Sequence, residues 1–144
     1  MSSMQPASMQ DWFAIHGLFV RYATSLDHGD VESVVDCFTS DAMLESPVLG
    51  KFEGHAGIRD FAQRTAALLE QGVQFRHVVS NVVAEVAGER AVARCYLLDF
   101  RTRDGMTALL SPGEYTCELR KVGSDWRFTS RVVVMDQPFT QRDL

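Results

Sequence analysis

The fold is decided by residues 74–135, which read QFRHVVSNVVAEVAGERAVARCYLLDFRTRDGMTALLSPGEYTCELRKVGSDWRFTSRVVVM. In this stretch apolar side chains tend to recur at every second position, which is the spacing of β-strands. Glycine-containing turn signals at residues 87–89, 103–105 and 123–125 interrupt the pattern. The stretch therefore predicts four strands joined by hairpins into a meander, covering Phe75–Val86, Ala91–Arg103, Leu109–Val122 and Trp126–Met135.

The residues before the meander have the three- and four-residue spacing of amphipathic helices. A first helix is indicated by five positions, Trp12, Ile15, Phe19, Tyr22 and Leu26. Gly29 suits the end of that helix, and Asp30 suits the N-cap of a short second helix over Val31–Phe38. A third helix of about four turns is indicated by Ile58, Phe61, Ala62, Thr65, Leu68 and Leu69. Between the second and third helices, residues 39–54 are expected to form short strands.

Helices followed by an antiparallel sheet predict the α+β class, with the helices packed on one face of a curved sheet. The chain has 144 residues, the length of one ordinary domain, and we expect a single domain over residues 1–144. Within it, residues 1–10 are expected to form a loose N-terminus and residues 137–144 a C-terminal tail.

The composition narrows the range of partners. A net charge of −5 and the lack of any basic run disfavour binding to nucleic acid. No apolar run approaches the ~18 residues that would span a membrane, and the first residues lack the apolar core of a signal peptide. The three cysteines, Cys37, Cys95 and Cys117, form no CxxC pair and suit buried thiols in a reducing compartment. We therefore expect a cytoplasmic protein with no nucleic-acid or membrane partner.

Two of the predicted strands are apolar on both faces. In Ala91–Arg103, Tyr96 and Leu98 lie on one face while Cys95 and Leu97 lie on the other, and Phe75–Val86 is rich in valine on both. A sheet that is apolar on both sides needs two covers. The helices supply one cover, and we expect a second subunit to supply the other in a homo-oligomer.

Several polar side chains fall where an apolar environment is predicted. His77 and Asn81 share one face of the first strand of the meander, and Asp99 lies on one face of the second. An ionisable group in an apolar interior is costly unless paired, and its pKa is then displaced, so such groups are candidates for proton transfer. If the first helix lies across the concave side of the sheet, Tyr22 on its apolar stripe and Asp27 at its end join this group.

Each of these residues also has a purely structural interpretation. His77 suits a satisfied core histidine or a strand end, Asp27 suits its turn, and Asn81 suits a backbone-bonding role. Tyr22 suits a core aromatic and Asp99 the polar end of a strand. On the functional interpretation, the candidate catalytic residues are Asp27, His77, Tyr22 and Asp99. The candidate substrate-binding residues are Asn81, Tyr115, Phe19 and Leu97.

The sequence lacks the motifs of other common chemistries. It has no HExxH motif, paired Cys–His spacing or DxDxDG loop, so no metal is predicted. It has no GxGxxG motif or P-loop for a nucleotide and no GxSxG nucleophile elbow. What remains is acid–base chemistry without a cofactor.

Five segments of the chain, in this order, carry a resemblance to a known family: RYATSLDHGD (21–30), CFTSDA (37–42), FEGHAGI (52–58), HVVSN (77–81) and GSDWR (123–127). Together they resemble the SnoaL-like branch of the nuclear-transport-factor-2-like (NTF2-like) superfamily, over residues 11–135. The resemblance implies a cone-shaped α+β barrel, in which three N-terminal helices pack on the concave face of a curved antiparallel sheet.

Within that superfamily the pattern is most similar to scytalone dehydratase, bile acid 7α-dehydratase and lindane dehydrochlorinase. In these enzymes an aspartate after the first helix pairs with a strand histidine that removes a proton, and the matching residues here are Asp27 and His77. Tyr22 matches a tyrosine of the bile acid enzyme, and RCYLLD (94–99) resembles its strand that ends in a functional aspartate. The chain lacks a clear counterpart of the second tyrosine and the second histidine of the scytalone enzyme.

Two functional hypotheses follow. The first is a cofactor-independent, dehydratase-like lyase or isomerase, in which an Asp–His dyad removes a proton from a small, largely apolar cyclic substrate. The second is a non-catalytic ligand-binding or assembly domain, similar to the β subunit of a ring-hydroxylating dioxygenase. A hydrogen bond between Asp27 and His77 beside an open cavity favours the first hypothesis. The resemblance leaves both a trimer and a dimer open for the homo-oligomer.

Overall fold

The computed structural model describes residues 3–144 of the chain. The helices are α1 (Met9–His28), α2 (Val31–Asp36), α3 (Gly54–Glu70) and a short 3-10 helix, η1 (Gln141–Asp143). The strands are β1 (Gln5–Pro6), β2 (Phe38–Ser46), β3 (Gly50–Glu53), β4 (Gln74–Ala87), β5 (Arg90–Arg103), β6 (Met106–Val122) and β7 (Asp125–Met135). The predicted α+β class is confirmed. No helix in the described part of the chain has the length and apolar character needed to cross a membrane.

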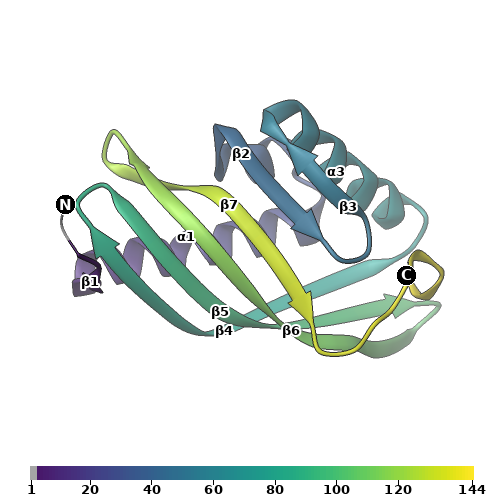
Figure 1. The fold of residues 1–144 in the computed structure, drawn as a ribbon. Helices are drawn as coiled ribbons and strands as arrows, with labels where there is room; N and C mark the ends of the chain where they lie inside the picture. The colour runs from purple at the N-terminus through teal and green to yellow at the C-terminus, as the bar shows by residue number, and fades with distance from the viewer. Residues whose placement is uncertain (1–2) are drawn as a thin grey trace.

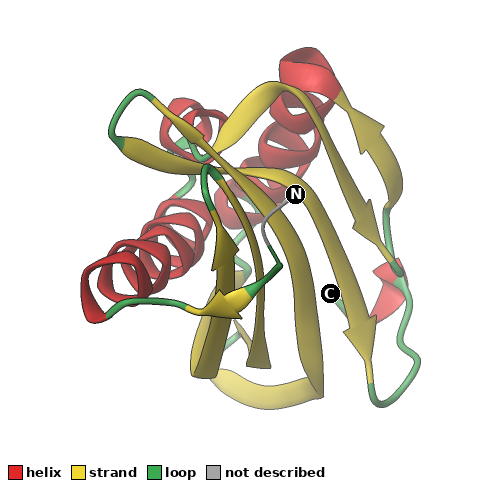
Figure 2. Cartoon of the chain, turned by 60° about the vertical axis from the view of Figure 1, so that its left-hand side comes forward, coloured by secondary structure: helices red, strands yellow, loops and turns green. Residues whose placement is uncertain are grey.

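The strands form one sheet in the order β1-β4-β5-β6-β7-β2-β3. Strands β4 to β7 form the predicted antiparallel meander. Strand β2 pairs with β7 in parallel, so the sheet is mixed rather than antiparallel throughout. Parallel pairing is possible here because the long stretch between the two strands serves as the crossover. The edge strands β1 and β3 lie at opposite ends of the order, and the curved sheet stays open instead of closing into a barrel (Figure 2).

Helix α1 lies against the concave face of the sheet, behind the strands in Figure 1, while α3 packs beside β2 and β3. Phe19 and Tyr22 of α1 contact Phe128 of β7, with ring centroids 5.2 and 6.2 Å apart. All three side chains are buried. Burying a large apolar side chain contributes about 1.5–3 kcal/mol, so these contacts hold α1 firmly against the sheet.

Both chain ends are more ordered than the expected loose N-terminus and tail. Gln5 and Pro6 pair with Glu85 and Val86 of β4, and α1 begins only three residues later, where the Ser8 side chain accepts a hydrogen bond from the backbone N–H of Asp11. Residues 1–2 lie outside the described residues. At the other end, residues 136–144 fold back on the sheet and bury the last side chain, Leu144.

A β-bulge in β4 changes which side chains of that strand face the core. The pairing with β5 shifts between Ser80 and Val83, and Asn81 adopts a φ of 57° at the shift. As a result the less exposed face continues through Val82 rather than through Asn81. The strand therefore looks apolar on both faces partly because its core-facing side chains switch from odd-numbered to even-numbered positions at the bulge.

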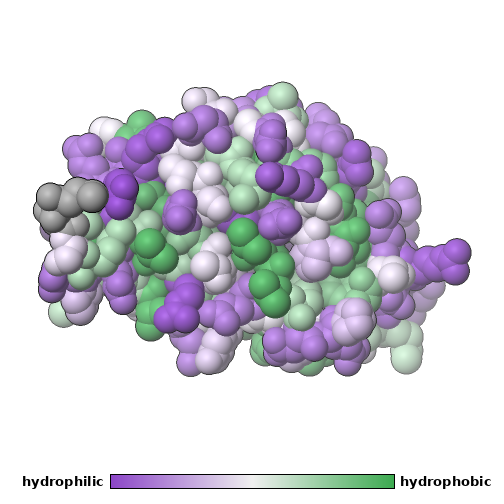
Figure 3. All heavy atoms as spheres, viewed as in Figure 1, coloured by the Kyte–Doolittle hydropathy of each residue, from purple (hydrophilic) through white to green (hydrophobic). Residues whose placement is uncertain are grey.

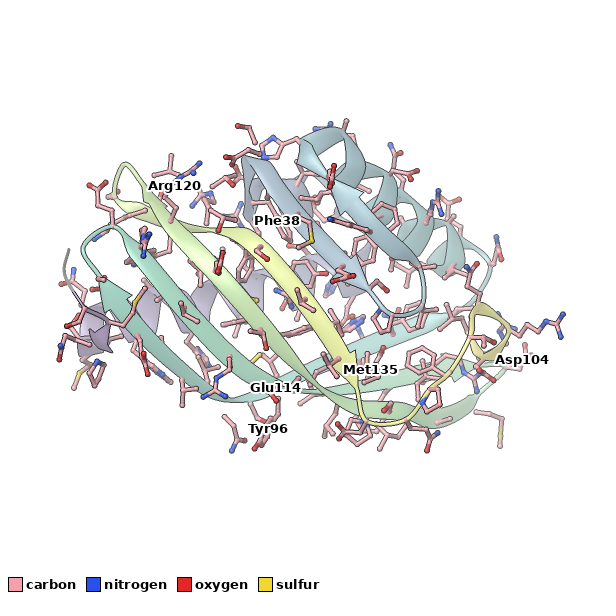
Figure 4. All side chains as sticks on the ribbon, in the orientation of Figure 1. Phe38, Tyr96, Asp104, Glu114, Arg120 and Met135 are labelled. Carbon is pink, nitrogen blue, oxygen red and sulfur yellow. The ribbon has the colours of Figure 1, made fainter. Side chains whose placement is uncertain are left out.

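The outer face of the sheet nevertheless carries exposed apolar side chains. We call Val78, Tyr96, Leu98 and Val134 the outer-face patch; they are 45%, 54%, 36% and 57% exposed. Val78 lies opposite Leu98, and Tyr96 and Val134 flank Glu114 in adjacent strands. Figure 4 shows Tyr96 and Glu114 projecting together where the sheet bends, and in Figure 3 apolar surface is visible among polar side chains on this side of the molecule.

Two glycines have opposite surroundings and give a test of the packing. A Cβ atom on Gly113 would lie 2.7 Å from the backbone oxygen of Val134, which cannot move without disturbing β7, whereas a Cβ on Gly17 of α1 would meet nothing within 4 Å. Gly113→Ala is expected to destabilise the fold by about 1–3 kcal/mol. Gly17→Ala is expected to stabilise it by about 1 kcal/mol, because alanine is the better helix former. Urea unfolding of both variants checks this, and equal midpoints would contradict the packing described.

Candidate active site

One apolar pocket lies between the helices and the concave face of the sheet. The space between its lining side chains, with the open mouth included, is about 630 Å³. Side chains from α1, α3, β2 and all four strands of the meander line it, mostly as Leu, Val, Phe and Met. The turn after β2 and the C-terminal residues Phe139 and Leu144 complete the wall. The polar groups in the lining are few: Tyr22, Ser46, Thr65, His77, Asp99 and Tyr115.

Asp27 and His77 meet at the edge of this pocket. The Asp27 Oδ1 atom lies 2.5 Å from His77 Nδ1, and Asp27 Oδ2 accepts a hydrogen bond of 3.0 Å from the backbone N–H of His77. The two side chains are only 9% and 10% exposed. Since a carboxylate accepts hydrogen bonds, His77 donates from Nδ1, and this leaves Nε2 as the free ring nitrogen.

The end of α1 positions Asp27. Gly29 ends the helix in the left-handed conformation, with φ 70°, and Asp27 lies in the last turn before it. The Gln74 side chain donates from Nε2 to the Asp27 carbonyl oxygen at 2.9 Å and to the Phe75 carbonyl at 2.8 Å. These bonds join the helix end to the start of β4, so the carboxylate faces the strand that carries the imidazole.

Asp99 lies on the other side of the imidazole. It is directly opposite His77 in the β4–β5 pairing, and its Oδ1 atom lies 3.5 Å from His77 Nε2. Oδ1 is buried and makes no hydrogen bond with any described residue. Burial raises the pKa of Asp99, and the charge of Asp27 raises it further against the opposing effect of His77. The neutral acid form of Asp99 is therefore favoured more than in water.

The pKa of His77 is raised above its ordinary value. Burial acts to lower it, but the hydrogen bond to Asp27 and the charges of Asp99 and Asp27 outweigh that effect. The charge of Arg131 opposes the rise. His77 is thus a stronger base than a free imidazole, and its remaining nitrogen lies beside a second acid.

Two tyrosine side chains line the same pocket. Tyr22 of α1 and Tyr115 of β6 are each 2% exposed, and their ring centroids lie 6.3 Å apart. Burial raises the pKa of Tyr22 to about 12 and raises that of Tyr115 further, although the charge of Arg131 opposes both rises. Both phenols therefore stay protonated across the physiological range and remain hydrogen-bond donors.

Arg131 lies next to these tyrosines and was not predicted as a site residue. Strict alternation from Trp126 and Phe128 would place it outside, but β7 carries an extra residue where its pairing with β6 shifts. The shift turns Arg131 inward, where it is 0% exposed. The only sequence feature that could have indicated a buried arginine is its position directly before the valine run 132–134. An arginine on the surface has the same sequence pattern.

A model of the SnoaL-like domain matches residues 7–132 of the chain. The chain belongs to the SnoaL-like family. Its fold is the NTF2-like fold shared with solved neighbours. No protein of curated function matches the chain significantly.

Three solved structures from Novosphingobium aromaticivorans illustrate the similarity. A protein provisionally assigned as an aromatic ring hydroxylase is 28% identical, with a TM-score of 0.80 over 92% of this chain and 93% of that one. A provisionally assigned scytalone dehydratase is 19% identical, with a TM-score of 0.76 over 90% and 89% of the two chains. The β subunit of a provisionally assigned aromatic-ring-hydroxylating dioxygenase is 22% identical, with a TM-score of 0.76 over 90% and 92%. The last two similarities concern the fold alone.

The SnoaL-like domain brings together most, but not all, of the predicted site residues. Asp27 and His77 are paired at the pocket, and its lining includes His77, Tyr22, Asp99, Tyr115 and Leu97. Phe19 is fully buried beneath the lining, between Tyr115 and Phe128, and does not reach the pocket. Asn81 is exposed because the β4 bulge turns it out. Among residues 3–144, no three His, Cys, Asp or Glu side chains are arranged to hold a metal ion.

Replacing Asp27 by asparagine is expected to lower the pKa of His77, because the substitution removes the negative charge that stabilises the imidazolium. A raised folded-state pKa stabilises the fold below the unfolded value of about 6.5, and this contribution is lost as the pH rises through the folded value. Asp27→Asn should therefore lose more stability at about pH 6 than at about pH 9. NMR titration of the histidine ring and urea unfolding measure the two effects. Asp60→Asn, at an exposed ion pair of α3, is the control.

Proposed function

We propose that this SnoaL-like domain is a cofactor-independent, dehydratase-like lyase or isomerase that removes a proton from a small, largely apolar cyclic molecule. His77 is the base, and Asp27 fixes its tautomer and stabilises the imidazolium that forms. The observation that carries the proposal is the 2.5 Å contact between Asp27 Oδ1 and His77 Nδ1, which leaves Nε2 free at the pocket. A positioned base of this kind contributes roughly 10²–10⁴-fold to a rate.

The pairing of His77 with Asp99 supports a division of acid and base roles. The two groups lie 3.5 Å apart, and in the reactive form that we propose Asp99 holds the proton they share, so that a neutral imidazole faces a neutral carboxylic acid. In a dehydration, Nε2 takes the proton next to a carbonyl, the carbon–carbon double bond forms, and Asp99 protonates the hydroxyl that leaves as water. Proton transfer from His77 to Asp99 then restores the starting state. In an isomerisation the proton returns to another carbon.

Tyr22 is suited to stabilise the enolate that forms when the proton leaves. Its raised pKa keeps the phenol as a donor, and a preorganised donor in a dry pocket is worth roughly 3 kcal/mol in the transition state. The apolar side chains of the remaining lining, among them Leu26, Leu44, Leu97 and Met135, favour a ring with few polar substituents.

The non-catalytic alternative is less well supported by these contacts. A ligand-binding or assembly domain needs a pocket or a surface, but it does not need an imidazole held between two carboxyl groups. Burying such groups lowers stability unless they are fully paired, and a domain that only binds or assembles has no need of them. The short Asp27–His77 distance is the observation that separates the hypotheses, and it favours the enzyme, whereas the open pocket suits both an enzyme and a ligand-binding domain.

Deuterium exchange tests the base directly. Incubation of the wild type with a panel of cyclic ketones and β-hydroxyketones in heavy water is expected to place deuterium next to the carbonyl. His77→Ala should slow this exchange by roughly 10²–10⁴-fold. Asp99→Asn should slow the loss of water more than the exchange, because it removes only the acid. Proton NMR of the recovered ketones gives the rates.

His28→Ala is the matched control, because His28 is exposed at the end of the same helix and bonds only the Thr24 carbonyl. It should exchange at the wild-type rate. Exchange that persists in His77→Ala, or a wild type that exchanges none of the ketones, would remove His77 from the role of base.

The three cysteines support a reducing compartment for this reaction. Cys37, Cys95 and Cys117 are all buried free thiols. Such thiols suit a protein that acts in the cytoplasm, where disulfides are rare.

We also infer that the outer-face patch is covered by another copy of the chain, as a dimer or trimer. Three of its exposed apolar side chains lie on the adjacent strands β4 and β5, and Val134 of β7 lies across Glu114 of β6 from Tyr96. An exposed apolar sheet face of this kind is commonly an interaction surface. Tyr96→Asp and Val134→Asp should each shift the protein to the mass of one chain in sedimentation or light scattering. Val122→Asp, at an equally exposed valine outside the patch, should leave the assembly intact. A wild type that is monomeric at high concentration would contradict this inference.

A further inference from the structure

Strand β4 has an edge that is largely without a neighbouring strand. In the described part of the chain, β1 pairs with only residues 85–86 of the 14 residues of β4. Side chains of α1 reach the rest of this edge near both ends of the helix. The Trp12 indole donates from Nε1 to the Val82 carbonyl oxygen at 2.9 Å, and Asp27 Oδ2 accepts from the backbone N–H of His77 at 3.0 Å. These bonds satisfy backbone groups that a neighbouring strand would otherwise pair.

The side chain of Gln74 makes a third attachment, which bridges two backbone carbonyl groups. Its Nε2 atom lies 2.9 Å from the carbonyl oxygen of Asp27 and 2.8 Å from that of Phe75. Both partners are acceptors, so the NH2 end of the amide faces them, and its two N–H bonds serve one carbonyl each. A single amide nitrogen therefore joins the last turn of α1 to β4 two residues before His77.

The carbonyl of Asp27 belongs to the last turn of the helix, where carbonyl groups have no partner within the helix. The left-handed conformation of Gly29 directs its backbone N–H to the Leu26 carbonyl oxygen at 3.2 Å, and Gln74 bonds the carbonyl that follows. The bond to Gln74 therefore restrains the backbone of Asp27 relative to β4. The carboxylate carbon of Asp27 is only two covalent bonds from its Cα atom, so the carboxylate is restrained as well.

The contact between Asp27 and His77 tolerates little movement of the helix end. Asp27 Oδ1 lies 2.5 Å from His77 Nδ1, and Oδ2 lies 3.0 Å from the backbone nitrogen of the same residue. A displacement of about 1 Å would take both contacts beyond the usual N–H···O range of about 2.7–3.2 Å. Gln74 is not among the residues that line the pocket, so any effect on a ligand passes through Asp27.

We propose that Gln74 is a positioning residue for the Asp27–His77 pair. Its amide holds the end of α1 at the distance from β4 at which Asp27 bonds Nδ1 of the imidazole and leaves Nε2 free. The importance of Gln74 for catalysis rests on the proposed function. Its effect on the position of the Asp27 carboxylate can be measured without a substrate.

Gln74→Met tests this role, because methionine keeps the length of the side chain and removes both donors. The charged groups that act on His77 are Asp27 of α1, Asp99 of β5 and Arg131 of β7, and of these only Asp27 is expected to move. The pKa of His77 should therefore fall, and more of the neutral ring should carry its proton on Nε2. Nitrogen-15 NMR of the labelled histidine ring measures both quantities. In an Asp27→Ala background, Gln74→Met should change neither of them further.

Two controls separate positioning from a general loss of stability. Trp12→Phe removes the side-chain bond between α1 and β4 at the other end of the helix. It should lower the urea midpoint about as much as Gln74→Met does, but leave the pKa and the tautomer of His77 as in the wild type. Gln63→Met, at an exposed glutamine of α3, should change none of these quantities.

The NMR results alone decide the positioning role. A pKa and tautomer of His77 that are unchanged in Gln74→Met would overturn it. An equal change in Trp12→Phe, or a change that persists in the Asp27→Ala background, would also overturn it, because the effect would then not pass through the contact between Asp27 and His77.

Deuterium exchange into cyclic ketones shows whether the position of Asp27 matters for the reaction. Gln74→Met should slow the exchange by roughly 10- to 100-fold, because a misplacement of about 1 Å can cost about 10²-fold. A wild type that exchanges no ketone would contradict the proposed function and leave the NMR evidence for Gln74 intact. Exchange that depends on His77 but proceeds at the wild-type rate in Gln74→Met would overturn the role of Gln74 and leave His77 as the base.

Discussion

Two hydrogen bonds join the last turn of α1 to the start of β4, and both are accepted by the carboxylate of Asp27 from His77. An acidic side chain in the last turn of a helix lies at the unfavourable end of the helix dipole. Asp27 therefore does not stabilise the helix. Its charge is stabilised by the ring and the backbone of a residue 50 positions later in the chain. The same contact fixes the helix on the sheet and the tautomer of the imidazole, so the geometry of the site and the packing of the domain depend on each other.

The sequence predicts the architecture well because the helices and strands have a regular spacing of apolar side chains. The three- and four-residue spacing of α1 and the alternation of the meander are local patterns, and both appear in the structure. Asp27 and His77 were singled out by the apolar setting of the histidine and by resemblance, and no local pattern measures the distance between residues 50 positions apart. That distance is decided by how α1 crosses the sheet, which depends on core packing of Phe19, Tyr22 and Phe128.

The differences between expectation and structure arise where a period is broken. One extra residue in β4 turns Asn81 outward, and one extra residue in β7 turns Arg131 inward. A bulge of one residue reverses every later side chain of its strand, and neither bulge has a glycine or proline to reveal it. The C-terminal residues were missed for a different reason. Their order comes from bonds such as that from the backbone N–H of Gln137 to Ser111 Oγ at 3.0 Å, and tertiary contacts of this kind leave no periodic signal.

Four ionisable side chains lie in and around the apolar pocket, and their burial bears on the function of the site. Asp27, His77, Asp99 and Arg131 are all largely buried, and two of them, Asp99 and Arg131, keep polar atoms without hydrogen bonds. Well-packed apolar side chains in the same places would stabilise most folds equally or better. The aliphatic lining would bind an apolar ligand without them. The unmet hydrogen-bonding capacity of Asp99 fits its proposed role as the acid, because a departing hydroxyl would be the partner that Oδ1 lacks within the described residues.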